Sequence, residues 1–220
     1  MSLCKVVSTP FTTGAKFSKE DGSPKANGQI YRSIIGSLLY LFATKPDIMF
    51  ATWLLSRFMQ EPSQIHFTAA KRIPRYVKGT LNFSLTYVKQ DSGNLIGHCD
   101  SDWVGSLDDS KTTNHALWLR KRLLDLGFEQ SQGTLICVDN LFVVSIAKNP
   151  VQYRRTTHIR VKYHALKGAV KENEGELKHC KTENQLADIF TKSLGRERFE
   201  HLRSCLGVQQ IMNHGAVLKY

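Results

Sequence analysis

The sequence predicts a mixed α/β protein, in which a helical first part precedes a part where strands and helices alternate. Apolar residues recur at helical spacing from Tyr31 to Tyr40 and again from Ile48 to Met59. From Phe83 onward, short apolar or β-branched runs alternate with amphipathic stretches, which is typical of a sheet with flanking helices. The 220 residues are 41% hydrophobic, so the chain contains enough apolar material to bury a core.

The first part is predicted to contain an extended leader and three helical stretches. Residues 1–28 are rich in Ser, Thr, Lys, Gly and Pro with little periodicity, and they look like a piece of a longer chain. Lys45-Pro46-Asp47 separates the first two helices, and a third is expected over 64–79. Pro74 lies inside that third stretch, where proline costs about 3 kcal/mol, so we expect a bent or interrupted helix.

The second part is predicted to form a sheet of mixed strand direction. Alternation over 83–88, a turn at 90–94 and a strand at 95–99 predict a β-hairpin. Gly127 is placed to end a strongly amphipathic helix over 115–128. The remaining expected elements are strands at 134–138 and 176–180 and helices at 142–148, 158–172, 184–192 and 197–206.

The charge balance favours a polyanionic partner. Thirty Lys and Arg against nineteen Asp and Glu give a formal net charge of +11, which favours nucleic acid, through phosphate neutralisation, ahead of an anionic membrane. The same excess also keeps a small protein soluble, and basic runs are commonly solvated helix faces. The candidate nucleic-acid-binding residues are Lys71, Arg72, Arg75, Lys78, Arg120, Lys121 and Arg122.

Cysteine spacing and the lack of long apolar runs predict a cytoplasmic or nuclear protein. The five cysteines are widely spaced and contain no C-x-x-C pair, so neither a disulfide framework nor a zinc site is indicated. The first ten residues lack the apolar core of a signal peptide. No run approaches the roughly 20 apolar residues that a membrane span requires.

Three aspartates stand out by their local contexts. Asp100 and Asp139 each close a short apolar run that reads as a strand, and Asp188 lies where a helix is expected to begin. Carboxylates delivered from separate elements to one end of a sheet suit Mg²⁺, which prefers oxygen ligands and bridges protein to phosphate. The arrangement suggests phosphodiester hydrolysis. Alternatively, the first two aspartates form turns and Asp188 caps a helix.

Longer motifs carry a resemblance to a known family. They include YRSIIGSLLYL at 31–41, LSRFM at 55–59, RYVKGT at 75–80, DSDW at 100–103, AKNP at 147–150 and TENQLADIFTK at 182–192. In these residues the chain resembles the C-terminal part of a copia-type retrotransposon Pol polyprotein, from the end of reverse transcriptase into the ribonuclease H domain. The resemblance covers roughly residues 5–208, and motifs of this length and order are highly specific.

The resemblance implies a ribonuclease H-like fold, a mixed five-stranded sheet with flanking helices, and Mg²⁺-dependent hydrolysis of RNA in RNA/DNA hybrids. Matched residue by residue, it places the catalytic and metal-ligating carboxylates on Asp100, Asp139 and Asp188. Asp102 would share the strand face of Asp100, but the family pattern favours Asp100. The implied division of the chain is a leader at 1–28, a helical reverse-transcriptase segment at 29–90, a truncated ribonuclease H-like domain at 91–208 and an unmatched tail at 209–220.

One departure from the family decides the expected activity. Between Thr113 and His115 the family carries roughly forty further residues, which comprise two strands and the helix start that bears a catalytic glutamate. We therefore expect a Pol fragment that is inactive, since the metal pair loses a ligand and the sheet loses two strands. The polymerase's own aspartates would precede Met1, so no DNA synthesis is expected.

Two alternatives stay open. The first is residual ribonuclease H activity, in which Asp109 or Glu129 replaces the missing glutamate. The second is a nucleic-acid-binding module without chemistry, whose affinity would fall strongly with salt.

Overall fold

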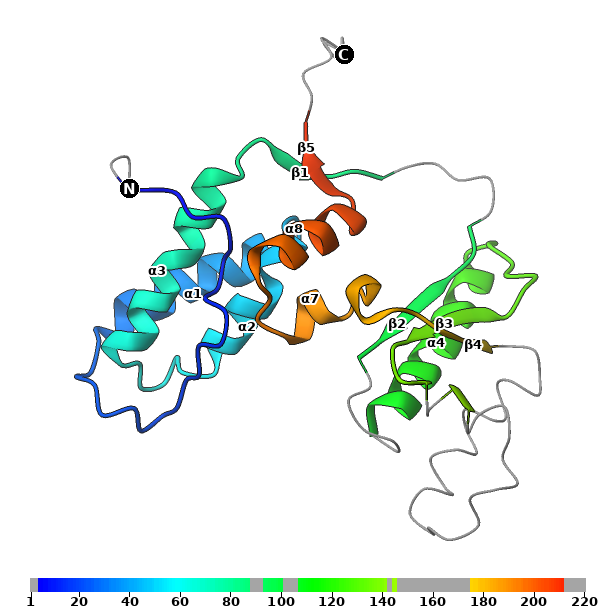
Figure 1. Ribbon diagram of the computed structural model, residues 1–220, viewed down its shortest axis with the longest axis horizontal. Coiled ribbons are helices and arrows are strands. Elements are labelled where there is room, and N and C mark those ends of the chain that lie inside the picture. The colour runs from blue at the N-terminus through cyan, green and yellow to red at the C-terminus, as the bar shows by residue number, and fades with distance from the viewer. Residues whose placement is uncertain (1–3, 88–92, 101–106, 142–143, 146–174, 212–220) are drawn as a thin grey trace, which may run out of the picture. The chain divides into compact units, whose positions relative to one another are not determined.

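The computed structural model describes residues 4–87, 93–100, 107–141, 144–145 and 175–211 (Figure 1). The chain forms two compact units. The helical unit comprises Met1–Tyr87 with Asp188–Tyr220, and the sheet unit comprises Val88–Ala187. The structure confirms the predicted mixed α/β class, because helices and small open sheets both occur.

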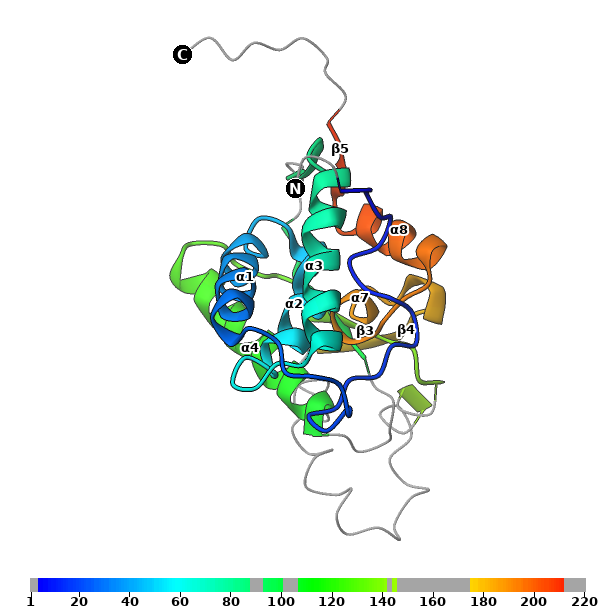
Figure 2. The same cartoon turned by 90° about the vertical axis from the view of Figure 1, so that its left-hand side faces the viewer.

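The helical unit is built on three helices that pack side by side (Figures 1 and 2). Asn27 caps the first helix by accepting a hydrogen bond from the backbone N–H of Ile30 at 3.0 Å. Buried side chains from the three helices form the core, and Tyr31 donates to the Leu55 carbonyl at 2.8 Å. The elements are α1 (Gly28–Leu41), the 3-10 turn η1 (Pro46–Ile48), α2 (Met49–Ser56), α3 (Gln64–Gly79), β1 (Phe83–Leu85), α7 (Asp188–Thr191), α8 (Arg196–Cys205) and β5 (Val208–Gln210).

Helix α3 has the bounds that the sequence predicts. Of the bend or interruption expected at Pro74, the interruption is wrong. The helix is continuous over Gln64–Gly79 with Pro74 inside it. Its apolar face, which includes Ile73 and Tyr76, is fully buried. Burial of such side chains contributes about 1.5–3 kcal/mol each, which offsets the backbone hydrogen bond that proline removes.

The C-terminal segment is joined to α3 by a buried contact. Phe199 of α8 packs edge-on against the Tyr76 ring, with centroids 5.7 Å apart. Arg203 donates to the Tyr76 hydroxyl at 3.0 Å, and that hydroxyl in turn donates to Asp47. These contacts explain why residues after Asp188 belong to the helical unit although they are distant in sequence.

The predicted hairpin between 83–88 and 95–99 is wrong. Strand β1 pairs antiparallel with β5, so that Phe83 lies opposite Gln210 and Leu85 opposite Val208. Gly207 adopts φ +84° just before β5, a left-handed conformation that favours glycine and lets the chain turn back from α8. Period-two alternation identifies a strand but not its partner, and here the partner follows a helix about 120 residues later.

The sheet unit contains three parallel strands in the order β2-β3-β4. A sheet of mixed direction was expected, but the antiparallel pair of the described residues lies in the helical unit. Parallel neighbours need a crossover connection, and α4 supplies the one between β2 and β3. The elements are β2 (Ile96–Cys99), α4 (Leu107–Asp125), β3 (Thr134–Val138), β4 (Gly175–His179) and the 3-10 turn η2 (Thr182–Asn184).

One face of this sheet packs under α4 (Figure 1). The buried cluster on that face contains Cys99, Ala116, Ile136, Val138, Val144 and Leu177. Alternation along the strands therefore sends Cys99 and Val138 toward α4 and the next residue of each strand toward the other face.

The other expected elements have mixed outcomes. The strands at 95–99, 134–138 and 176–180 and the helix at 197–206 are confirmed within one residue as β2, β3, β4 and α8. Helix α4 begins at Leu107, eight residues before the predicted start. The helix expected over 184–192 is shorter, since only Asp188–Thr191 is α-helical. The helix at 158–172 and most of that at 142–148 lie outside the described residues.

The compact units and the sequence-based domains divide the chain differently. The contacts group the residues from Asp188 onward with the first unit, whereas the sequence groups residues 91–208 together. The domain division therefore stays a prediction. None of the described helices combines the length and the apolar character needed to cross a lipid bilayer.

Candidate metal centre

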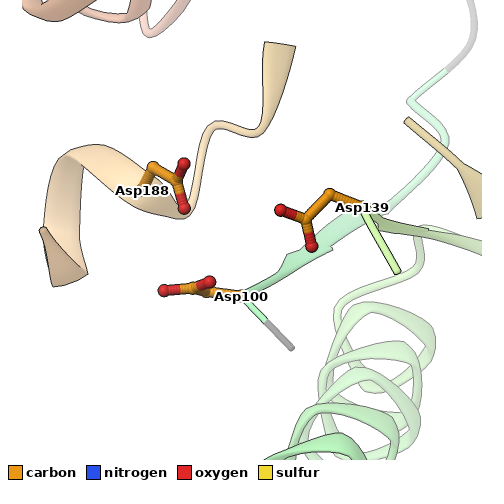
Figure 3. Close-up of side chains that lie close together, drawn as sticks. All are labelled: Asp100, Asp139 and Asp188. Carbon is orange, nitrogen blue, oxygen red and sulfur yellow. The ribbon is translucent and has the colours of Figure 1, made fainter. Parts of the chain in front are cut away.

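Asp100 and Asp139 are brought together by the register of two parallel strands. Cys99 pairs with Val138 at the ends of β2 and β3, and each aspartate directly follows the last residue of its strand. A carboxylate oxygen of Asp100 lies within 4.8 Å of one of Asp139. Both side chains are half-buried, and Figure 3 shows them directed away from α4. Two adjacent oxygen donors of this kind suit a hard divalent cation.

The burial of the preceding residues fixes this placement. Cys99 is 4% exposed and Val138 is 2% exposed in the cluster beneath α4. Because side chains alternate along a strand, burying these two residues directs both aspartates to the opposite face. A one-residue slip of either strand would turn its aspartate toward the buried face and its apolar neighbour away from it, so the register is strongly specified.

Gln185 connects the two strand ends to the segment that leads into α7. Its fully buried amide donates from Nε2 to the Cys99 carbonyl at 2.8 Å and to the Cys137 carbonyl at 3.4 Å. Its Oε1 accepts from the backbone N–H of Ala187 at 3.4 Å and lies 3.2 Å from Nδ1 of His98. Sequence reasoning missed this residue as a functional candidate. The available signal was a polar residue inside the TENQLADIFTK motif.

Asp188 lies in the helical unit as the first residue of α7, as Figure 3 also shows. Its side chain is fully buried and forms two ion pairs. Lys192 Nζ, one helical turn later, is 3.1 Å from Oδ1, and the Arg198 guanidinium contacts Oδ2. Two cations therefore compensate the buried negative charge, which would otherwise be costly. Sequence reasoning did not single out Lys192 and Arg198.

Three of the four candidate basic residues of α3 are occupied by contacts with the leader. Arg72 donates to the backbone carbonyl and the hydroxyl of Thr9, at 3.1 Å and 3.0 Å. Arg75 donates to the Lys5 carbonyl at 2.7 Å, and Lys78 to the Cys4 carbonyl at 3.0 Å. The ammonium of Lys71 lies 4.0 Å from the Phe67 ring centroid. These contacts hold the leader against α3, and nucleic-acid binding by these residues stays a prediction.

The three basic residues of α4 differ in their surroundings. Arg120 donates to the Gln130 carbonyl at 2.9 Å and to the Gln132 carbonyl, so it holds the loop before β3. Arg122 forms an exposed ion pair with Asp125 at 3.2 Å, and Lys121 is exposed. Lys121 and Arg122 are therefore the basic candidates of this helix that face solvent.

The alternative acidic candidates are placed as follows. Asp109 belongs to the first turn of α4, and Glu129 is exposed in the loop that follows this helix. Asp102 lies outside the described residues. Among the described residues of the sheet unit, Asp100 and Asp139 are acidic side chains whose carboxylate oxygens lie within 4.8 Å of each other.

The chain is a strongly basic, mixed α/β protein with carboxylates at its strand ends. Comparison with known proteins gives its family. The chain is 31% identical to the Retrovirus-related Pol polyprotein from transposon RE1 of Arabidopsis thaliana, over 96% of this chain and 17% of the relative. It is 29% identical, with the same coverage, to that from transposon RE2 of Arabidopsis thaliana. It is 28% identical to that from transposon TNT 1-94 of Nicotiana tabacum, over 94% of this chain and 19% of the relative. The chain belongs to the retrovirus-related Pol polyproteins of copia-type transposons.

The chain spans less than one fifth of the length of these relatives. The alignment with the RE1 polyprotein has 249 positions but covers 96% of a 220-residue chain, so roughly forty of its positions have no counterpart here. This number agrees with the internal gap that the sequence motifs indicate. No protein-family model matches the chain, and no solved structure matches it.

Proposed function

We propose that the chain is a Pol-derived fragment whose ribonuclease H-like part retains a divalent-cation site but has lost efficient hydrolysis of RNA/DNA hybrids. The observation that carries this proposal is the pairing of Asp100 and Asp139 at adjacent carboxyl ends of parallel strands, within 4.8 Å of each other. Paired strand-end carboxylates on a basic chain suit a cation that bridges protein to phosphate.

Chain connectivity supports Asp188 as the third ligand. Gln185 is hydrogen-bonded to the carbonyl of Cys99, the residue before Asp100. Three residues of chain span at most about 10 Å, so Asp188 stays tethered close to the strand ends. We therefore infer from this chain connectivity that Asp188 joins Asp100 and Asp139 as a ligand when a metal ion is bound.

The donor set fits Mg²⁺ better than a soft metal. All three side chains offer carboxylate oxygen, which is the ligand type that Mg²⁺ prefers. When bound, Mg²⁺ polarises a phosphate oxygen and lowers the pKa of water. The protein's own part is to hold Asp100 and Asp139 at a fixed spacing through the strand register. Lys192 and Arg198 compensate the buried charge of Asp188 by pairing with it.

Two observations support the loss of turnover. Roughly forty aligned positions of the relatives are missing from this chain, and the family resemblance places the catalytic glutamate in such a segment. The alternative acids do not replace it well, because Glu129 is exposed in a loop. With fewer carboxylates, the repulsion between two bound cations is less compensated, so the rate falls.

Cleavage of a fluorophore-labelled RNA/DNA hybrid in Mg²⁺ tests the proposal. We expect negligible cleavage by the folded wild-type chain, together with Mn²⁺ binding that the Asp100→Asn/Asp139→Asn variant loses. Robust cleavage abolished in that variant would instead establish residual ribonuclease H activity. Wild-type protein that is folded but does not bind Mn²⁺ would contradict the cation site.

A second candidate function is nucleic-acid binding without chemistry. The net charge of +11 favours it, together with the exposure of Lys121 and Arg122 on α4. Binding to hybrid or duplex would then fall steeply with salt and would survive the Asp100→Asn/Asp139→Asn change. Affinity that is indifferent to salt would exclude this candidate.

A further inference from the structure

We propose that Gln185 is a positioning residue that sets the affinity of the carboxylate site for a divalent cation. The inference rests on the proposed function, because it assumes that the strand-end carboxylates bind a cation. Gln185 does not need to contact the ion. It acts through the backbone that carries the aspartates.

The contacts of Gln185 make it a bridge between three segments. The amide nitrogen of Gln185 donates hydrogen bonds to the carbonyl of Cys99, the last residue of β2, and to the carbonyl of Cys137 in β3. The amide oxygen accepts a hydrogen bond from the backbone N–H of Ala187, in the segment before α7. Each of these backbone positions is within two residues of one of the three aspartates.

Burial makes this bridge rigid. The Gln185 side chain is 0% exposed, so water does not compete for its donors and acceptor. His98 of β2 also contacts its oxygen, at 3.2 Å, which further fixes the orientation of the amide. Because the buried amide is hydrogen-bonded through both its nitrogen and its oxygen, it restricts movement of the backbone that carries the aspartates. Cation sites depend on such a fixed spacing of their ligands.

The chain offers a matched control in Gln130. This amide also bridges backbone to backbone in the sheet unit: its Oε1 accepts from Leu95 N–H at 2.9 Å and its Nε2 donates to the Gly93 carbonyl at 2.9 Å. It therefore acts at the start of β2, at the end away from Asp100. Both Gln185→Met and Gln130→Met keep side-chain length while removing the hydrogen bonds.

The experiment measures Mn²⁺ affinity of the full chain by electron paramagnetic resonance of free Mn²⁺, alongside denaturant unfolding. We expect Gln185→Met to weaken Mn²⁺ binding by about tenfold or more, which is typical for outer-shell partners. Gln130→Met should lower stability but change Mn²⁺ affinity by less than about twofold. Gln185→Asn, which keeps the amide but shortens its reach, should weaken binding by an intermediate factor.

The outcomes separate this inference from the proposed function. Wild-type affinity in Gln185→Met, or equal weakening in Gln130→Met, would overturn the role of Gln185 while leaving the cation site intact. A folded wild-type chain that does not bind Mn²⁺ overturns the proposed function, and the inference with it. If both Gln185 variants fail to fold while Gln130→Met folds, Gln185 is a structural residue and the positioning role is refuted.

Discussion

The imidazole of His66 accepts a hydrogen bond at Nδ1 from the backbone N–H of Ser63, at 3.1 Å, while the Ser63 hydroxyl caps His66 N–H at 3.3 Å. This reciprocal capping box starts α3. The Ser63 hydroxyl also donates to Asp21 of the leader, and the His66 ring stacks on Phe58 with centroids 3.8 Å apart. One buried histidine thus joins the helix start, the core and the leader.

The helical unit should lose stability when the pH falls below about 6.5. Burial lowers the pKa of His66, an effect that the nearby Asp21 carboxylate opposes and that a backbone contact with Ser18 also opposes. The folded state therefore binds fewer protons than the unfolded state as the pH falls from the unfolded pKa through the folded one, so the free energy of unfolding decreases there. Protonated Nδ1 also cannot accept from Ser63. Denaturant unfolding at pH 7.5 and pH 5.5 measures the loss.

The matched variant is His66→Gln, which can keep the capping box but does not titrate. Its stability should change little between these two pH values. An equal loss of stability in the variant would assign the pH dependence to other groups. Asp21 acts in a separate, more acidic range, because hydrogen bonds from Ser63 and Ser23 lower its pKa to about 2.

Replacing Gly207 with alanine should destabilise the helical unit by about 2 kcal/mol. The residue has φ +84°, and a Cβ there would lie 3.0 Å from the Thr86 carbonyl oxygen. Gly14→Ala is the control, because Gly14 has φ +73° in the same unit but no atom within 4 Å of an added Cβ. Urea unfolding should therefore show a smaller loss for Gly14→Ala. Equal losses would mean that backbone conformation alone, and not the contact with Thr86, constrains Gly207.

Replacing Arg198 with methionine should cost about 2 kcal/mol of stability, since the partner carboxylate of Asp188 is fully buried. The Arg198 side chain itself is 33% exposed, which moderates the effect. Arg196→Met on the same helix breaks only the exposed pair with Glu200 and should cost less than about 0.5 kcal/mol. Unfolding curves that fail to separate the two variants would contradict the importance of the buried ion pair.

If the chain binds nucleic acid through α4, Lys121→Ala should weaken binding and reduce the dependence of log affinity on log salt by about 1. Arg72→Met is the comparison, because that guanidinium is engaged with Thr9 of the leader. We expect the affinity of the Arg72→Met variant for nucleic acid to stay within about twofold of the wild-type affinity. Fluorescence anisotropy with labelled hybrid at several salt concentrations measures both quantities. A larger effect of Arg72→Met would instead place the interface on α3.

Features of the fold that depend on neighbouring residues could be predicted from the sequence, whereas those that depend on distant residues could not. The bounds of α3 and β3 follow from periodicity and from caps such as Ser63, which act within a few residues. The partner of β1 did not follow, because alternation at Phe83 carries no information about a strand near residue 209. Pro74 was expected to bend or interrupt its helix, but the helix is continuous, because burial of its apolar face outweighs the local cost.

The sequence by itself determined the family, through long ordered motifs, and the placement of Asp100 and Asp139 at strand ends. Tertiary structure alone decided the spacing of these residues and the contacts around them. Strand register sets the spacing of the two carboxylates, and Gln185 reaches the Cys99 carbonyl from 86 residues away. It also decided that Arg72 and Arg75 donate hydrogen bonds to backbone carbonyls of the leader. The physical reason is that periodicity and capping act over a few residues, whereas hydrogen bonds and ion pairs depend on which segments pack together.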